Sequence, residues 1–228
     1  MPEISSSPWR DESELAMVRD WFFPNRTTKD PYGSEHIEDM RSEAIAKVNV
    51  WTFKSHKVPP AVLSTADLTD SILKYEQMAQ TADPNSYRAV QFMFAFAFMR
   101  FVNGFVDRDA NRAATASLAT SEDDIEEERN VKVAGESSMY AHAAAIAMPS
   151  RFVDLRHQVS HGELPEVHVL KKAAEDAMAW LWDRWWKGNV TGDAALALRR
   201  FRANRQQREQ MQHGEQADAA PTAVNLQN

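Results

Sequence analysis

Two histidines and an arginine lie close together within positions 156–161 of this sequence. Arg156 directly precedes His157, and His161 follows four residues after that histidine. Residues four apart lie about 40° from each other around a helix axis, so the two histidines share a face if the segment is helical. Arg156 lies off that line, but its side chain is long enough to bend toward it. One short helix would then present two imidazoles and one permanent positive charge.

These three side chains are what RNA cleavage without a metal requires. One group removes the proton from a ribose 2′-hydroxyl, whose oxygen attacks the adjacent phosphorus, and a second group donates a proton to the leaving 5′ oxygen. Histidine suits both proton transfers because its unperturbed pKa of about 6.5 lies near working pH. Arginine stays charged and can donate two parallel hydrogen bonds to a phosphoryl group. The residues alone do not decide which histidine is the acid and which is the base.

The same spacing permits two other interpretations. A His-x-x-x-His pair on a helix can bind zinc, although the metalloprotease form places Glu directly after the first histidine, where this chain has Gln158. His168 or Asp154 would then have to act as the third ligand. Alternatively, the arginine and the histidines only pack, either at the surface or in a core.

The composition is that of a soluble globular protein, because 43% of the 228 residues are hydrophobic and 26% are charged. No cysteine occurs, which excludes disulfides and thiolate catalysis. The net charge of −7 opposes nucleic-acid binding, but the charge is unevenly distributed. Residues 122–128 are almost all acidic, whereas a basic cluster follows later at Arg199, Arg200, Arg202, Arg205 and Arg208. Such a cluster is typical of a solvated helix face, and contact with RNA or a role in nuclear import is the alternative.

The hydrophobic pattern is helical, with no strand-like repeat, and predicts an all-α fold. Helices are expected at about residues 11–23, 34–53, 84–106, 139–147, 150–161 and 166–186, and after Pro59-Pro60. The apolar stretch Ala89–Met99 is shorter than the roughly 20 residues that span a bilayer. We interpret it as part of a central helix that is buried on all sides, and we expect no membrane contact. The N-terminal residues also lack the regions of a signal peptide.

Several blocks of the sequence, in the right order, resemble the N-terminal domain of the Las-type ribosome-biogenesis endoribonucleases of the HEPN superfamily. The resemblance covers about residues 8–186. It rests on Pro8-Trp9-Arg10, the stretch from Trp51 to Thr65, the run Arg100–Asp107, and most specifically Pro149–His157 with Ser160-His161, Leu164-Pro165 and Trp185-Trp186. The sequence departs from the family pattern at Gly162, where an acidic residue is usual, and in the acidic stretch from Ser121 to Arg129.

The resemblance implies a HEPN-type helical bundle with Arg156, His157 and His161 as catalytic residues and with neither metal nor cofactor. It also implies a homodimer in which two copies of the motif face one composite cleft. A second copy would help the geometry, because Arg156 and His161 lie about 140° apart on one ideal helix. The implied reaction is metal-independent cleavage of pre-ribosomal RNA in its second internal transcribed spacer, which yields a 2′,3′-cyclic phosphate and a 5′-hydroxyl.

The resemblance further implies a polynucleotide 5′-kinase partner and a nuclear or nucleolar location. Family members are longer, and their C-terminal part, which binds the kinase, has no visible equivalent in this sequence. We predict an endoribonuclease domain at residues 1–189, with an acidic loop or insertion at 118–136, and a basic helix and flexible tail at 190–228. The competing hypothesis is a non-catalytic helical module that dimerises or serves as a scaffold in an RNA-processing complex.

Overall fold

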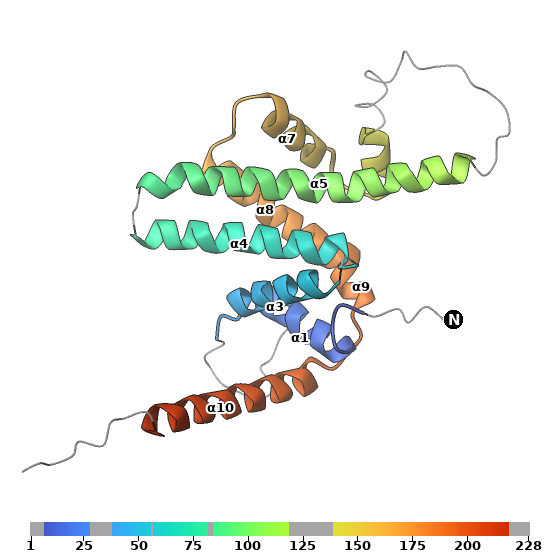
Figure 1. The fold of residues 1–228 in the computed structure, drawn as a ribbon. Helices are drawn as coiled ribbons and strands as arrows, with labels where there is room; N and C mark the ends of the chain where they lie inside the picture. The colour runs from blue at the N-terminus through green and yellow to red at the C-terminus, as the bar shows by residue number, and fades with distance from the viewer. Residues whose placement is uncertain (1–6, 28–37, 56, 82–83, 119–138, 219–228) are drawn as a thin grey trace, which may run out of the picture. The chain divides into compact units, whose positions relative to one another are not determined.

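The computed structural model describes residues 7–27, 38–55, 57–81, 84–118 and 139–218. Within these ranges every regular element is a helix, which confirms the all-α prediction (Figure 1). The side chains of residues 107–118 and 213–218 are not part of this description. The predicted acidic loop at 118–136 and the end of the predicted tail lie outside the described residues, apart from the backbone of Leu118 at one end of that loop.

The helices group into two compact units. Unit 1 consists of Met1–Pro8 and Glu38–Asn189, and unit 2 combines Trp9–Ile37 with Val190–Asn228. Unit 1 contains α3 (Arg41–Lys54), α4 (Pro60–Thr81), η1 (Pro84–Ser86), α5 (Tyr87–Leu118), a helical segment at 139–145, α7 (Ser150–His161), α8 (Val167–Leu181), the π-helical turn η2 (Trp182–Trp186) and α9 (Lys187–Asn189). Unit 2 contains α1 (Glu12–Phe22), α2 (Pro24–Thr27) and α10 (Ala194–Asp218). The predicted domain boundary at residue 189 stays a prediction.

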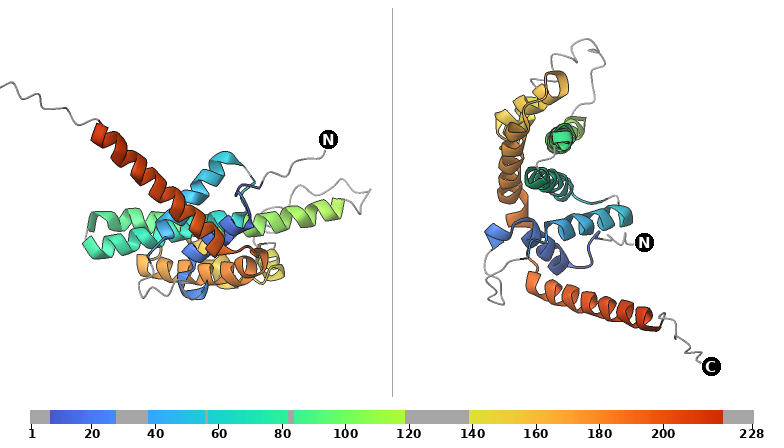
Figure 2. Two further views of the ribbon diagram at one scale, coloured as in Figure 1. Left: turned by 90° about the horizontal axis from the view of Figure 1, so that it is seen from below. Right: turned by 90° about the vertical axis from the view of Figure 1, so that its left-hand side faces the viewer.

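Helix α5 is the central element of unit 1. It lies side by side with α4, while α7 and α8 pack on it from another side (Figures 1 and 2). Its alternating phenylalanines divide between two environments, as a helix requires. Phe94 and Phe98 are buried, whereas Phe92 and Phe96 are 52% and 56% exposed. The prediction that this helix is buried on all sides is therefore wrong, because Phe92 and Phe96 are exposed and α7 covers only the later part of their face, at Met99 and Asn103.

The helical segment Tyr87–Val106 of α5 has 20 residues and is long and apolar enough to cross a membrane by these two criteria alone. Half of its most apolar part is buried inside the fold. The fully buried ring of Phe101 contacts the rings of Phe98, Phe105 and Trp180, with edge-to-face geometry in each pair. Such packing is what the core helix of a folded domain provides.

The end of α8 contains a π-helical turn that changes which tryptophan is buried. Sequence periodicity places Trp185 on the inner face, four residues after Leu181, but the structure buries Trp186 and leaves Trp185 partly exposed. In a π-helical turn each backbone N–H donates to the carbonyl five residues earlier instead of four. The position that faces the core therefore shifts by one residue toward the C-terminus. The indole of Trp186 donates a hydrogen bond to Oγ1 of the buried Thr65 on α4, at 2.9 Å. The extra residue thus joins the end of α8 to α4.

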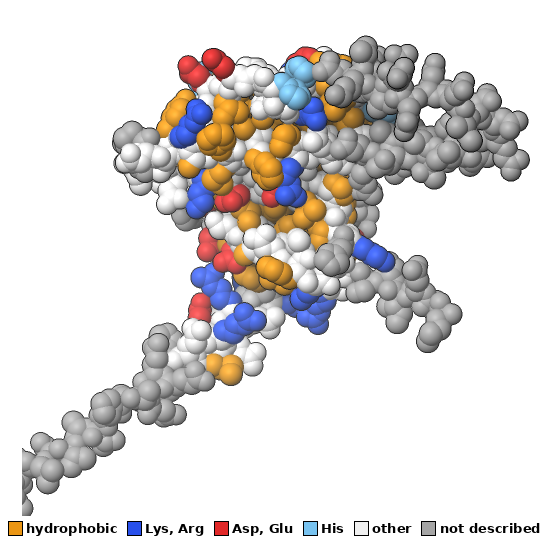
Figure 3. Space-filling view, turned by 45° about the horizontal axis from the view of Figure 1, so that its top comes forward, with side chains coloured by type: hydrophobic (Ala, Val, Ile, Leu, Met, Phe, Trp, Pro, Cys, Tyr) orange, Lys and Arg blue, Asp and Glu red, His pale blue; other side chains and the backbone are white. Residues whose placement is uncertain are grey.

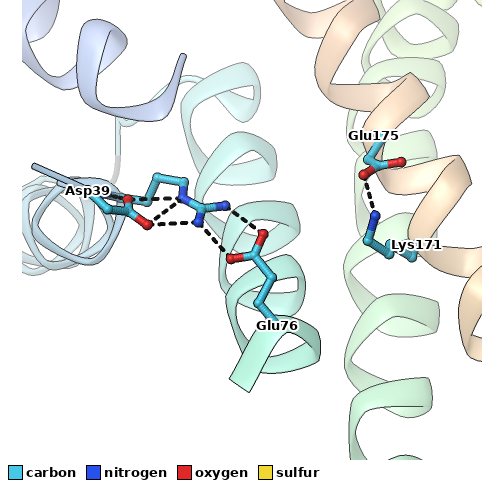
Figure 4. Close-up of polar contacts among 5 residues, drawn as sticks. Asp39, Glu76, Lys171 and Glu175 are labelled. Atoms are coloured by element: carbon cyan, nitrogen blue, oxygen red, sulfur yellow. Dashed lines mark hydrogen bonds and ion pairs between the residues drawn. The ribbon is translucent and has the colours of Figure 1, made fainter. Parts of the chain in front are cut away.

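Ion pairs also join helices within unit 1. The guanidinium of Arg41, at the start of α3, lies between two carboxylates (Figure 4). It donates to Asp39 and, at 2.6 and 3.1 Å, to both carboxylate oxygens of Glu76 on α4. The hydrogen bonds from Arg41 lower the pKa of Asp39 below its usual value. This bidentate contact holds α3 against α4.

Unit 2 is built by α1 and α10, which lie far apart in the sequence. The ring of Trp21 on α1 contacts Phe201 on α10 edge-to-face, with centroids 5.0 Å apart. Asp11 caps α1 by accepting from the backbone N–H of Glu14, and it also accepts two hydrogen bonds from Arg200 at 2.7 and 3.0 Å. Any side chain at Gly192 would overlap the backbone of α1, so the segment that leads into α10 requires a glycine here.

Candidate active site

The predicted catalytic segment is helix α7, which spans Ser150–His161 as expected. The buried Phe152 and Val153 anchor its first turns. The ring of Phe152 lies edge-to-face against Phe98 and Phe101 of α5, with centroids 5.5 and 5.7 Å apart. Because one side of α7 is fixed to the core in this way, its later residues reach the surface in a defined orientation.

The two histidines lie together at the exposed end of α7. The ring centroids of His157 and His161 are 5.1 Å apart, and both side chains are exposed. This confirms the expectation that the four-residue spacing places them on one face. The helix ends directly after them, where the backbone N–H of Gly162 donates to the carbonyl of Gln158. Gly162 has an extended backbone conformation, so it does not need the left-handed freedom of a glycine cap.

Arg156 is held by a residue from a different helix. Its Nε donates a hydrogen bond of 2.9 Å to Oδ1 of Asn103 on α5. One turn later on α7 and one turn earlier on α5, the hydroxyl of Ser160 contacts Met99 and donates to the carbonyl of Arg156. Sequence reasoning assigned no role to Asn103. The available signal was an amide side chain in the second half of the predicted helix 84–106, which is apolar apart from Arg100, Asn103 and Gly104.

The residues considered as further zinc ligands have other contacts. His168 lies 3.2 Å from a carboxylate oxygen of Glu166, on the exposed start of α8. Asp154 accepts a hydrogen bond of 2.5 Å from the hydroxyl of Tyr140. Within the described part of the chain, no group of three His, Cys, Asp or Glu side chains is arranged to hold a metal ion.

The turn that leads into α7 has an unusual backbone. Ala147 adopts a left-handed conformation with φ of 55°, which is the only such non-glycine residue in the described chain. Its N–H donates to the carbonyl of Ala144, and the N–H of Met148 donates to that of Ala143. This pair of bonds is the Schellman motif, which ends a helix and usually has glycine at the left-handed position. The indole of Trp180 on α8 donates to the carbonyl of Ala147 and so fixes the turn before α7.

A stripe of exposed residues on α5 adjoins the arginine and the histidines. We define the α5 stripe as Arg88, Phe92, Phe96 and Arg100, which follow one another at four-residue intervals. The Arg88 and Arg100 guanidinium groups lie over the rings of Phe92 and Phe96. Met99 and Asn103, which contact α7, lie on the same face of α5 because they continue its spacing of three and four residues. Hydrophobic, basic and histidine side chains are accordingly exposed together on this face of unit 1 (Figure 3).

The charge beside the α5 stripe is partly balanced by α4. Arg100 lies 3.5 Å from a carboxylate oxygen of Asp67. Burial raises the pKa of Asp67 above its usual value, and the nearby Arg100 only partly opposes that effect. The end of the α5 stripe that lies near Asn103 therefore has one arginine, Arg100, beside a carboxylate whose neutral form is favoured by burial.

Taken together, these features define an all-α helical protein that exposes two adjacent histidines at the end of one helix and holds a half-buried arginine directly before them. The chain belongs to the Las1-like family, whose model matches residues 7–188. It is 32% identical over 188 residues to Protein LAS1 of Saccharomyces cerevisiae and 24% identical over 189 residues to the pre-rRNA-processing protein las1 of Schizosaccharomyces pombe. Both alignments cover 82% of this chain and 32% of the relative, so the chain spans about a third of the length of these relatives. The ribosomal biogenesis protein LAS1L of Mus musculus is 23% identical over 154 residues, which are 67% of this chain and 16% of that protein.

Proposed function

We propose that this chain is a HEPN-type endoribonuclease domain that acts in pre-ribosomal RNA processing. The observation that carries the proposal is the pair His157 and His161 at the exposed end of α7, with the half-buried Arg156 directly before it, inside the region that matches the family. Relatives of this chain are named for pre-rRNA processing and ribosome biogenesis. The cleavage site that we propose is the second internal transcribed spacer, in the nucleus or nucleolus.

The proposed reaction needs no metal ion. One imidazole removes the proton of a ribose 2′-hydroxyl, the 2′ oxygen forms a bond to the adjacent phosphorus, and the bond to the 5′ oxygen breaks. Another imidazole gives its proton to that leaving oxygen, so the products are a 2′,3′-cyclic phosphate and a 5′-hydroxyl. Ring centroids 5.1 Å apart are close enough for both histidines to reach the oxygens of one phosphodiester. Arg156 offsets the charge that grows on the phosphoryl oxygens.

The proposed active form is a homodimer, and the α5 stripe supports it. The order Arg88, Phe92, Phe96, Arg100 reads the same in both directions at a constant spacing of four. Two copies related by a two-fold axis can therefore place Phe92 of one copy against Phe96 of the other. In this antiparallel pairing the two copies of Asn103, and with them Arg156, lie at opposite ends of the shared stripe, about 27 Å apart by helix rise. The α5 stripe is therefore proposed to hold the dimer together and not to join the two catalytic segments at one phosphate.

A polynucleotide 5′-kinase partner is part of the same proposal. The 5′-hydroxyl product is the substrate such a kinase would take, which gives the two activities a chemical order. The chain spans about a third of the length of its yeast relatives, and we assign the proposed kinase binding to none of the helices described above.

End-group analysis of a spacer RNA incubated with the purified protein tests the function directly. We expect a 2′,3′-cyclic phosphate and a 5′-hydroxyl, with cleavage unchanged by EDTA. Single Arg156→Ala, His157→Ala and His161→Ala variants should abolish cleavage and keep the helical circular-dichroism signal. His168→Ala, which removes an exposed histidine of α8, is the matched control and should cleave normally.

Full activity in the triple alanine variant would refute the assignment of the site. RNA binding with no cyclic-phosphate product, by wild-type protein that is dimeric, would instead establish the scaffold hypothesis. Strict dependence on an added divalent metal would contradict the proposed mechanism.

A further inference from the structure

The second half of α10 is a basic helix without an apolar face. Every side chain from Arg202 to Gln212 is exposed, and Met211 is the one large hydrophobic residue among them. From Ala194 to Gln212 the helix contains five arginines and a single acidic residue, Glu209. The whole chain has a net charge of −7, so this helix concentrates positive charge in a protein that is otherwise acidic.

The five arginines do not all serve the fold. Arg200 is bonded to Asp11 and holds α10 against α1. The other four are exposed and follow one another at intervals of three residues: Arg199, Arg202, Arg205 and Arg208. One of them, Arg205, also donates to the carboxylate of Glu209 on the next turn, at 3.1 Å. We call these four residues the α10 stripe. On a helix, each step of three residues rises about 4.5 Å and turns by about 60°, so the stripe extends over roughly 13 Å and winds half-way around the helix.

We propose that the α10 stripe binds the phosphate backbone of RNA, without reading its sequence. This inference rests on the proposed function in that it takes RNA as the substrate. Guanidinium groups match phosphate oxygens in geometry and remain charged.

A protein partner fits this surface less well than RNA does. Stable protein interfaces need a desolvated centre, in which aromatic and other apolar side chains provide most of the binding energy. Residues 202–212 contain no aromatic residue, and Met211 alone could serve as an apolar anchor. Charge therefore dominates the recognition by this part of α10, and a repeating polyanion is the ligand that charge alone selects.

A binding experiment that does not depend on cleavage tests the proposal. Fluorescence anisotropy would measure the affinity of the full chain for a single-stranded RNA with 2′-O-methyl groups, which cannot undergo attack by a 2′-hydroxyl. In the variant R199Q/R202Q/R208Q we expect the affinity to fall roughly tenfold or more at about 0.1 M salt. The slope of log affinity against log salt should decrease in magnitude by about 2, since each phosphate contact contributes about 0.7 for a single strand.

Two matched variants complete the test. Q206A/Q207A/Q210A changes the same helix at uncharged positions and should bind as wild type. R199K/R202K/R208K keeps the charge and should retain the salt dependence. Arg, Gln and Lys all favour helices, so circular dichroism should be the same for each variant.

The proposal is overturned if the Gln variant binds as wild type, if its loss is confined to one RNA sequence, or if it loses binding to poly-glutamate but not to RNA. Arginine-dependent binding with no cleavage of unmodified RNA would support the α10 stripe and refute the endonuclease. Normal cleavage together with unchanged binding in the arginine variants would support the endonuclease and refute the α10 stripe.

Discussion

Arg156 and Asn103 meet across the contact between α7 and α5, where Nε of the guanidinium donates to the amide oxygen at 2.9 Å. A guanidinium has five N–H donors in one plane, so a single bond at Nε sets the direction of the four that remain. Asn103 therefore positions Arg156 and is not itself proposed to touch the RNA. The pair connects the central helix of unit 1 to the residues at the end of α7.

Asn103→Ala should lower the rate constant kcat of RNA cleavage by roughly ten- to hundredfold, because a loosely held Arg156 no longer meets the phosphate in a fixed geometry. A second background separates positioning from a merely structural role. Arg156→Lys keeps the charge but lacks the planar Nε–H that bonds Asn103, so adding Asn103→Ala to Arg156→Lys should lower kcat little further. A full ten- to hundredfold further loss in that background would show that Asn103 acts independently of Arg156.

Disruption of the α5 stripe should separate the proposed dimer. Phe92→Glu/Phe96→Glu places two carboxylates on the surface that would be buried between copies, and we expect a monomer by sedimentation with greatly reduced cleavage. Phe53→Glu is the control, because Phe53 on α3 is 92% exposed and lies outside the stripe. It should leave the mass in solution unchanged. If the Phe92/Phe96 variant keeps the oligomeric state of the wild type, the α5 stripe is not the dimer interface.

Ala147→Gly should stabilise the protein. The left-handed conformation costs a non-glycine residue about 1–2 kcal/mol, and the added flexibility of glycine in the unfolded chain offsets roughly 0.4–1 kcal/mol of that gain. We expect a net increase of about 0.5–1 kcal/mol in the free energy of unfolding, measured with urea. Ala145→Gly, two residues earlier in ordinary helical conformation, should instead lose about 1 kcal/mol. Equal effects at both positions would refute the assignment of strain to Ala147.

The sequence predicts the helices of unit 1 well where hydrophobic spacing is regular. The bounds of α7 follow from the start signal at Pro149-Ser150 and the stop signal at Gly162, and the shared face of His157 and His161 follows from their four-residue spacing. The helix predicted from residue 34 begins instead at Arg41 in the described chain, where Asp39 accepts a hydrogen bond from the backbone N–H of Arg41. Helix ends of this kind depend on single side chains, which a periodic pattern does not detect.

Other features depend on tertiary contacts and have no local signal. The π-helical turn that buries Trp186 in place of Trp185 becomes visible only with its hydrogen bond to Thr65, 121 positions away. The Schellman turn at Ala147 lacks the glycine that normally marks it. Asn103 belongs to the candidate site because α5 and α7 are in contact, and the sequence carries no local signal of that contact.

Acid should weaken the contact between α1 and α10. The hydrogen bond from Arg200 is the main cause that lowers the pKa of Asp11 below its ordinary value of 3.8. A carboxylate with a lowered pKa stabilises the fold above its unfolded pKa, and that contribution is lost as the pH falls through the folded pKa. The melting temperature of wild type should therefore exceed that of Asp11→Asn at pH 6, and the difference should vanish as the pH falls well below 4.

Asp20 is the control for this pH dependence, because its shift has the opposite sign. Burial raises the pKa of Asp20, and Arg19 only partly opposes the effect. Asp20→Asn should then melt no lower than wild type at pH 6. If Asp11→Asn and Asp20→Asn show the same pH dependence, Arg200 is not what stabilises the Asp11 carboxylate.

The bond between Asp11 and Arg200 joins residues 189 positions apart. A ribosome adds roughly 5–20 residues per second, so α1 leaves it about ten to forty seconds before α10 is made. The residues of α3 to α9 are synthesised in that interval and form a contiguous stretch, Glu38–Asn189, that can pack on its own contacts. During the same interval the ring of Trp21 has no Phe201 ring to contact. Helix α1 therefore lacks its partner α10 while residues 38–189 are synthesised. A chaperone would have time to bind α1 in that interval.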